Sequence, residues 1–167
     1  MDVSLKEIVD EAGLRELLVV AVADATPEET MPPVEGPPGW TEEKQRSFLD
    51  FFLPKVSSEG TAAFAVMVGL QIAGFMRLRR MAEQGVAETG MWLGRSYRGK
   101  GIGAAAFDAI LTEAAKRGYA RVIADTTPQN VAALGVLRRG RARMREGDGK
   151  IYAEIAIDPG YAAELEK

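Results

Sequence analysis

Hydrophobic and polar positions divide the first forty residues into a strand, a helix and a loop. Residues 3–9, VSLKEIV, predict a short strand. Residues 13–25, GLRELLVVAVADA, predict a buried helix, because Leu, Val and Ala dominate a run that is longer than a typical strand. Residues 26–40, TPEETMPPVEGPPGW, are rich in Pro and Gly and predict a long loop, of the kind that often shapes a substrate site.

A second helix is predicted from Thr41, which is a suitable N-cap because Glu42 and Glu43 then occupy the electropositive first turn. Its apolar face consists of Phe48, Leu49, Phe52 and Leu53. Pro54 is expected to end this helix, because proline lacks the backbone N–H that a helix interior needs.

Three strands are predicted next. Residues 61–70 and 71–81 form two of them, joined by a tight turn at Gly69, and residues 87–94, AETGMWLG, form the third. Alternating apolar side chains mark one face of the first strand: Phe64, Val66 and Val68.

A strand–helix–strand unit is predicted to follow. The helix runs from about residue 101 to 117 and is ended by Gly118, and residues 120–126, ARVIADT, form a short buried strand. The side chains expected to face inward are Ile102, Ala106, Ala109 and Ile110. Two strands connected by one helix are typically parallel neighbours.

The remaining segments predict a helix from about Asn130 to residue 140, and a closing hairpin of residues 141–146 and 150–158 around the turn GDG. No repeat is present. The length of 167 residues, with 47% hydrophobic and 27% charged residues, fits a single domain over residues 1–167.

Composition then narrows the function. A net charge of −3 argues against a general nucleic-acid binder, and no apolar run is long enough to span a bilayer. The opening MDVSLKEIVDEAG does not resemble a signal peptide, so we expect a cytoplasmic protein without membrane or nucleic-acid partners. Because the chain has neither Cys nor His, thiol nucleophiles, His-based triads and ordinary zinc sites are excluded and no metal is expected.

The densest chemical signal is the segment RGKGIG, in which Gly99, Gly101 and Gly103 alternate at the start of a predicted helix. Glycines let a ligand approach the main chain closely, and the first N–H groups of a helix have no internal partners. The segment therefore predicts an anion site, most often a phosphate site, with Arg98 and Lys100 at its rim.

Two common phosphate motifs fit this segment poorly. The P-loop requires Ser or Thr directly after GK, and here Gly99 and Lys100 are followed by Gly101 and Ile102. The dinucleotide turn is approximated by Gly99, Gly101 and Ala104, but it belongs at the start of a doubly wound domain, whereas the preceding strands predict an antiparallel meander.

The pattern Arg98-x-x-Gly101-x-Gly103 resembles the acetyl-coenzyme A signature, R/Q-x-x-G-x-G/A, of the GNAT N-acetyltransferase superfamily. The segment MWLGRSYRGKGIG resembles the family's strand, linker and pyrophosphate loop, and DTTPQNVAALGVL resembles its second cofactor segment, with Asn130 at the expected asparagine. The order of elements is similar across nearly the whole chain. The opening segments look most like the branch of ribosomal-protein-alanine N-acetyltransferases.

This resemblance implies an α/β fold of the α+β type, with a mixed, mostly antiparallel sheet that splays between its fourth and fifth strands and is flanked by helices. Acetyl-CoA would be the cosubstrate, lying in that opening. Backbone groups of Trp92 and Leu93 would hold the pantetheine and thioester, and Asn130 would border the pantetheine arm. The N–H groups expected at the pyrophosphate belong to Arg98, Gly99, Lys100, Gly101, Ile102, Gly103 and Ala104.

Two departures from the family pattern concern the general acid and the end of the last helix. Many members place a Tyr, which protonates the leaving thiolate, where this chain has Leu137, and the usual K-x-G-F ending is replaced by RRGRARM. The acid is therefore open, with Tyr97 and Tyr152 as the remaining candidates.

Glu88, at the start of the strand leading to the thioester, is the best candidate for the catalytic base. An exposed charge at a strand end explains it equally well. Glu83 lies in a predicted turn, and Asp125 is expected to be structural.

The function implied is transfer of an acetyl group from acetyl-CoA to a primary amine, either a protein N-terminus or a small molecule, by direct attack in a ternary complex. An aminoglycoside-type antibiotic acetyltransferase and a non-catalytic acyl-CoA sensor are the alternatives. The sequence leaves open the amine, the use of other acyl groups, and whether the chain forms a homodimer.

Overall fold

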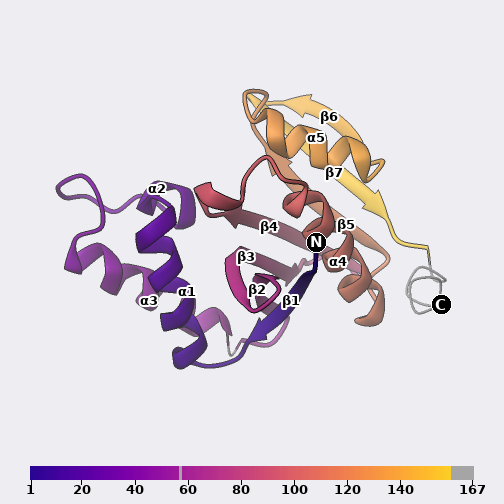
Figure 1. The fold of residues 1–167 in the computed structure, drawn as a ribbon. Helices are drawn as coiled ribbons and strands as arrows, with labels where there is room; N and C mark the ends of the chain where they lie inside the picture. Colours follow the sequence, from indigo (N-terminus) through magenta and orange to yellow (C-terminus); the bar gives the residue numbers. More distant parts are fainter. Residues whose placement is uncertain (57, 159–167) are drawn as a thin grey trace. The chain divides into compact units, whose positions relative to one another are not determined.

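The computed structural model describes residues 1–56 and 58–158, whose helices and strands are labelled in Figure 1. The strands are β1 (Val3–Ile8), β2 (Thr61–Val68), β3 (Gln71–Arg80), β4 (Val86–Leu93), β5 (Arg121–Thr126), β6 (Arg143–Gly147) and β7 (Lys150–Ala156). The helices are α1 (Glu11–Asp24), α2 (Pro27–Thr30), α3 (Glu42–Val56), α4 (Ile102–Lys116) and α5 (Val131–Arg139), with one 3-10 turn, η1 (Arg95–Tyr97).

The strands form one sheet in the order β1-β2-β3-β4-β5-β7-β6. β1 pairs antiparallel with β2, and β7 pairs antiparallel with both β5 and β6. β4 and β5 are parallel neighbours, as the predicted strand–helix–strand unit required. The predicted fold class, a mixed and mostly antiparallel sheet with flanking helices, is confirmed.

The pairing of β4 with β5 is short. It runs from Val86 opposite Arg121 to Glu88 opposite Ile123, although β4 continues to Leu93. β5, in contrast, is paired with β7 along its whole length, from Arg121 to Thr126. The two parallel strands therefore share a ladder only where they begin, as expected for a sheet that splays between its fourth and fifth strands.

The contacts divide the chain into two compact units, residues 1–77 with 91–98, and residues 78–90 with those from 99 onward. The prediction of a single domain over residues 1–167 stays a prediction, and residues 57 and 159–167 of that range lie outside the described residues. No helix in the described part is long and apolar enough to cross a membrane.

In the first unit, α1 and α3 pack around a core that includes Leu14, Leu17, Phe48, Phe52 and Phe75. Helix α1 is confirmed, but it is buried on one side. Its apolar residues at 19 and 22 face outward and are 69% and 38% exposed.

The predicted loop 26–40 contains a short helix, α2, which the Pro and Gly content concealed. Thr26 and Glu29 form a capping box, in which each side chain accepts a hydrogen bond from the other residue's backbone N–H. Two side-chain hydrogen bonds hold the rest of the loop. Trp40 Nε1 donates to the Ala25 carbonyl at 3.0 Å, and the buried Lys44 donates through Nζ to a loop carbonyl, that of Pro37, at 2.6 Å.

Helix α3 begins as predicted, with the Thr41 hydroxyl accepting from the Lys44 N–H at 3.2 Å. The prediction that Pro54 ends it is wrong, because the helix continues to Val56. A proline near a helix end removes only one backbone hydrogen bond, and Lys55 Nζ donates to the Phe51 carbonyl in this turn at 3.0 Å. The predicted inward-facing position at residue 53 is also wrong, since that leucine is 36% exposed.

In the second unit, α4 and α5 follow β4 and β5, and β6 and β7 form a hairpin. This hairpin is confirmed, and its turn residues Asp148 and Gly149 both have positive φ, 53° and 75°. Gly140 ends α5 against α4, where a Cβ atom would lie 2.7 Å from Phe107 Cε1. The unusual RRGRARM ending thus contains a glycine that close packing between the two helices requires.

Candidate active site

The glycine segment forms the turn that the sequence predicted. Gly99 and Gly101 adopt the left-handed conformation, with φ of 71° and 82°, and Gly101 is the N-cap of α4. A glycine cap supplies no side-chain acceptor, and in the described chain the N–H groups of residues 101–104 donate to no acceptor. A helix N-terminus with unpaired N–H groups is suited to an anion.

The side chain of Arg98 is hydrogen-bonded within the first unit. Its Nε and Nη2 donate to the carbonyl oxygen of Leu93, at 3.0 and 2.9 Å, and Nη2 also donates to Glu29 Oε2. Arg98 therefore braces the end of β4 from within the first unit. Lys100 is exposed and remains a candidate rim cation.

Glu29, which Arg98 contacts, has a pKa below its ordinary value. Partial burial raises the pKa of this carboxyl, but hydrogen bonds from Thr26 and Arg98 outweigh the burial and favour the ionised form. The side chain of Glu29 is 32% exposed and that of Arg98 is 43% exposed, so solvent screens part of their attraction.

Trp92 is 8% exposed and belongs to the core of the first unit, in agreement with a packing role for its side chain. Its indole Nε1 is buried and has no hydrogen-bond partner among the described residues. Binding of a ligand by the backbone of Trp92 or Leu93 stays a prediction.

The turn after β4 is held by further side chains. Ser96 donates from its backbone N–H and its hydroxyl to the carboxylate of Asp24, and the Tyr97 hydroxyl donates to Gln71 Oε1 at 3.0 Å. The hydroxyl of Tyr97 thus has a partner within the first unit, and its role as an acid stays a prediction.

The other positions named from the sequence lie in the second unit. The Asn130 side chain caps α5 by accepting from the Ala133 N–H at 3.1 Å, and Leu137 is buried on α5 with 5% exposure. Tyr152 lies on β7 under the Arg145 guanidinium, whose carbon is 4.6 Å from the ring centre. None of these contacts tests the predicted roles in cofactor binding or proton transfer.

Among the candidate bases, Glu88 is the most sheltered. Its side chain is 14% exposed, and its Oε2 accepts from Arg79 Nη2 at 3.1 Å. Glu83 is bonded to Arg121, and Asp125 lies 3.7 Å from the ammonium of Lys150.

Residues 23–141 match the model of the acetyltransferase (GNAT) family. The chain belongs to this family. A search of curated proteins by sequence found no match.

Solved acetyltransferase structures resemble most of the chain. RimL, a ribosomal L7/L12 alpha-N-protein acetyltransferase solved with coenzyme A, has a TM-score of 0.70 at 20% identity, with 94% of this chain and 95% of RimL covered. AAC(6')-Ib, solved with ribostamycin and coenzyme A, has a TM-score of 0.70 at 17% identity, covering 93% and 94%. Campylobacter jejuni N-acetyltransferase PseH has a TM-score of 0.69 at 14% identity, covering 93% and 99%. At these identities the likeness establishes the fold.

Sequence reasoning missed the residues that hold the turn, Asp24, Glu29 and Gln71. The capping box Thr26-Pro-x-Glu29, with proline at the first helical position, marks the start of α2 but not the contact of Glu29 with Arg98. Asp24 and Gln71 are distant from the turn in sequence, and no local pattern marks them.

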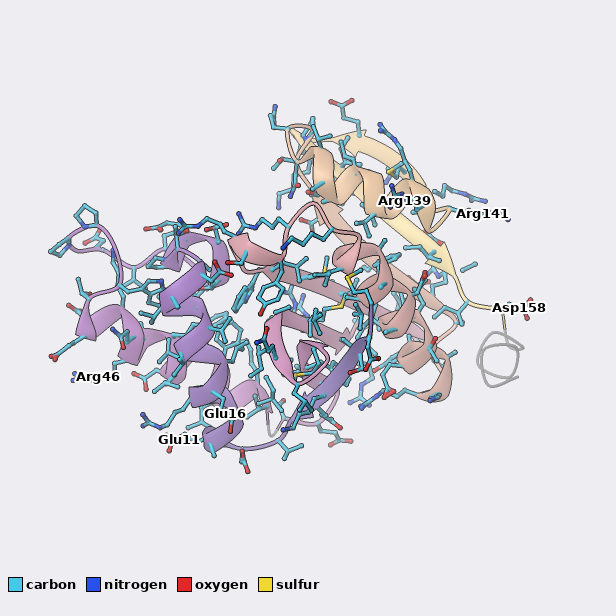
Figure 2. The ribbon with its side chains drawn as sticks, in the orientation of Figure 1. Glu11, Glu16, Arg46, Arg139, Arg141 and Asp158 are labelled. Atoms are coloured by element: carbon cyan, nitrogen blue, oxygen red, sulfur yellow. The ribbon has the colours of Figure 1, made fainter. Side chains whose placement is uncertain are left out.

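The stretch 138–145, RRGRARMR, which includes the unusual ending of the last predicted helix, is rich in arginine. Its arginine side chains are exposed, and Arg139 and Arg141 are labelled at the edge of the second unit in Figure 2. Arg141 adopts φ of 58° where α5 ends. Arg143 and Arg145 lie opposite Glu154 and Tyr152 on β7, so part of this charge is compensated within the hairpin.

Proposed function

We propose that this chain transfers an acetyl group from acetyl-coenzyme A to a primary amine. The observation that carries the proposal is the left-handed glycine turn at the start of α4, with unpaired N–H groups at residues 101–104, in a chain of the GNAT family. Such a turn suits the pyrophosphate of coenzyme A. Leu93, just before the turn, would contribute backbone groups to the pantetheine arm, as the family signature implies.

In the proposed reaction, the amine nitrogen attacks the carbonyl carbon of the thioester. A C–N bond forms, the C–S bond breaks, and the sulfur leaves as a thiolate. The chain contains no cysteine to carry an acetyl group, so transfer is direct. Alignment of both reactants supplies much of the rate, since effective molarities in favourable cases reach ~10⁵ M or more.

Proton transfer limits the choice of residues. An alkylamine with a pKa of ~10.4 is almost entirely protonated at neutral pH, so a base or a water chain must accept a proton. Glu88, held by Arg79, is the proposed acceptor. The side chain of Leu137 cannot donate a proton, and the thiolate is left to water, which is feasible because a thiol has a pKa of ~8.5.

The proposed acceptor is a protein N-terminus or a small-molecule amine. RimL is described as an alpha-N-protein acetyltransferase, and AAC(6')-Ib as an aminoglycoside acetyltransferase. The two resemble this chain equally well, each with a TM-score of 0.70. The fold therefore supports the shared chemistry, attack by an amine, and does not choose between the two acceptor classes.

The test combines binding with turnover. Coenzyme A should bind in titration calorimetry, and acetyl-coenzyme A should release thiol with at least one amine from a panel of free-N-terminus peptides and aminoglycosides. Initial-rate plots against both substrates should intersect. Parallel lines would contradict direct transfer, and tight coenzyme A binding without turnover on any amine would favour the acyl-coenzyme A sensor.

A further inference from the structure

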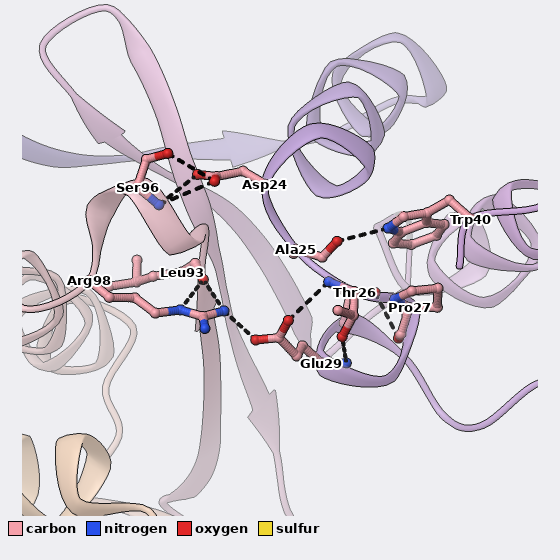
Figure 3. A network of polar contacts seen from close by, with 10 residues as sticks. Asp24, Ala25, Thr26, Pro27, Glu29, Trp40, Leu93, Ser96 and Arg98 are labelled. Atoms are coloured by element: carbon pink, nitrogen blue, oxygen red, sulfur yellow. Dashed lines mark hydrogen bonds and ion pairs between the residues drawn. The ribbon is translucent and has the colours of Figure 1, made fainter. Parts of the chain in front are cut away.

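Two carboxylates from residues 24–29 hold the turn that follows β4. The carboxylate of Asp24 accepts from the Ser96 N–H, at 3.2 and 3.1 Å from its two oxygens, and from the Ser96 hydroxyl at 2.9 Å. Glu29 Oε2 accepts from Arg98 Nη2. We call Asp24, Glu29, Ser96 and Arg98 the carboxylate clamp, and Figure 3 shows all four residues with these contacts.

Asp24 lies at a helix end where its negative charge is unfavourable. It is the last residue of α1, where the helix dipole disfavours a negative charge. Space for its carboxylate depends on Gly94, because a Cβ atom there would lie 2.3 Å from Asp24 Oδ2. The carboxylate therefore lies where the helix dipole is unfavourable and where only a glycine at position 94 leaves room for it. Its hydrogen bonds with Ser96 offset this cost.

Glu29 connects two parts of the first unit. Its Oε1 accepts from the Thr26 N–H at 3.0 Å, which fixes the start of α2, while its Oε2 accepts from Arg98. Arg98 in turn donates twice to the Leu93 carbonyl. A continuous chain of charge-assisted hydrogen bonds thus runs from α2 to the end of β4.

We propose that Asp24 and Glu29 are positioning residues for coenzyme A. Through Ser96 and Arg98 they hold the end of β4 and the 3-10 turn η1 in the conformation that binds the cofactor, and neither contacts it. This inference rests on the proposed function, because it assigns the same segment to coenzyme A. The family signature specifies Arg or Gln at position 98 and says nothing of a carboxylate partner.

The role differs from simple stabilisation of the fold. A positioning residue changes the affinity of the folded protein for coenzyme A, whereas a purely structural residue changes only the fraction that is folded. Since the clamp touches no reacting atom, its loss should raise KM for acetyl-coenzyme A and leave kcat nearly unchanged.

The main experiment is titration calorimetry with coenzyme A on Glu29→Gln, with Glu28→Gln as the matched control. Glu28 lies on the same short helix, is exposed, and makes no hydrogen bond or ion pair within the described residues. For Glu29→Gln we expect Kd to rise about three- to tenfold, the range of a partly exposed ion pair that also carries hydrogen bonds. Glu28→Gln should bind as the original protein does.

A second comparison tests the route through Arg98. Arg98→Gln keeps a residue that the family signature allows, but its shorter side chain cannot reach Leu93 and Glu29 together. Glu29→Gln should therefore add no further loss in an Arg98→Gln background, because the two residues act as one unit. Additive losses would contradict the clamp.

The outcomes separate the two proposals. If the original protein does not bind coenzyme A, the proposed function fails. If it binds, and Glu29→Gln retains the same Kd and KM as Glu28→Gln, the positioning role is wrong while the proposed function stands. Should Glu29→Gln fold poorly, Glu29→Asp serves instead, because it keeps the charge but shortens the reach to Arg98 and should also raise Kd.

Discussion

A Cβ atom on Gly74 would lie 2.2 Å from the carbonyl oxygen of Trp92. It would also lie 2.9 Å from Leu93 Cα, so β3 approaches the end of β4 more closely than a side chain permits. The neighbouring residues are bonded, with the Gly94 N–H donating to the Ala73 carbonyl at 2.8 Å. The end of β4 is thus fitted against a strand whose glycine leaves the necessary room.

We therefore expect Gly74→Ala to displace the end of β4. It should lower the free energy of unfolding by ~1–3 kcal/mol, as overpacking does, and weaken coenzyme A binding. Gly135→Ala is the control, because its Cβ meets no atom within 4 Å and alanine favours the helix α5 in which it lies. Urea unfolding should show opposite signs for the two variants. Equal effects would show that the close approach at Gly74 is unimportant.

The strands, α1 and α3 to α5 could be predicted because their signals are local. Alternation marked β2, and the cap at Thr41 marked the start of α3. The same principle explains the error at Pro54, where a general rule for helix interiors was applied within three residues of a helix end.

The glycine turn could be located from sequence, but the partners of Ser96 and Arg98 before it could not. Gly99 and Gly101 favour a left-handed backbone at the start of the predicted helix, since glycine tolerates it best. The partners of Ser96 and Arg98 depend on how α1, α2 and the end of β4 pack in the first unit. One sequence gives no measure of which acidic residue will lie beside which cation.

The left-handed turn at Gly101 should be essential for binding. Gly101→Val forces a β-branched residue to φ of about 82° and places its side chain where the phosphate needs the main chain, so coenzyme A affinity should fall at least tenfold. Gly118→Val controls for strain alone, because Gly118 has φ of 84° at the other end of α4 and open space around its Cβ. Titration calorimetry on the two folded variants makes the comparison. Unchanged affinity in Gly101→Val would rule out the anion site.

The pKa of Glu29 gives its contribution to stability a definite pH dependence. Because the folded-state pKa lies below the ordinary value of 4.5, Glu29 stabilises the fold above pH 4.5, and this contribution is lost as the pH falls through the lowered pKa. The free energy of unfolding of the original protein should exceed that of Glu29→Gln by up to ~1 kcal/mol at pH 7, since the pair is partly exposed.

The measurement is urea unfolding of both proteins between pH 3 and pH 7. The difference should be constant above about pH 4.5 and shrink below it, and added salt should reduce it. A difference that grows on acidification would have the wrong sign for a carboxylate with a lowered pKa. Glu28→Gln should show no such dependence on pH.

Proton acceptance by Glu88 is the step of the proposed mechanism that experiment can test most directly. Its side chain is 14% exposed and is held by Arg79, so replacement by Gln keeps the size and much of the hydrogen bonding while removing the base. If Glu88 accepts the amine proton, directly or through one water, Glu88→Gln should lower kcat by ~10²–10⁴-fold and change coenzyme A affinity far less.

The pH profile decides between a base and a structural residue. As the pH rises toward the pKa of the amine, ~10.4 for an alkylamine, more of the substrate arrives neutral and needs no base. The deficit of Glu88→Gln should therefore shrink with rising pH, whereas a deficit caused by a disturbed ion pair with Arg79 would persist. Arg79→Gln supplies that comparison, because it breaks the same pair and leaves the carboxylate in place. If Glu88→Gln and the original protein give superimposable profiles with the same amine, the proton goes to water or to another carboxylate.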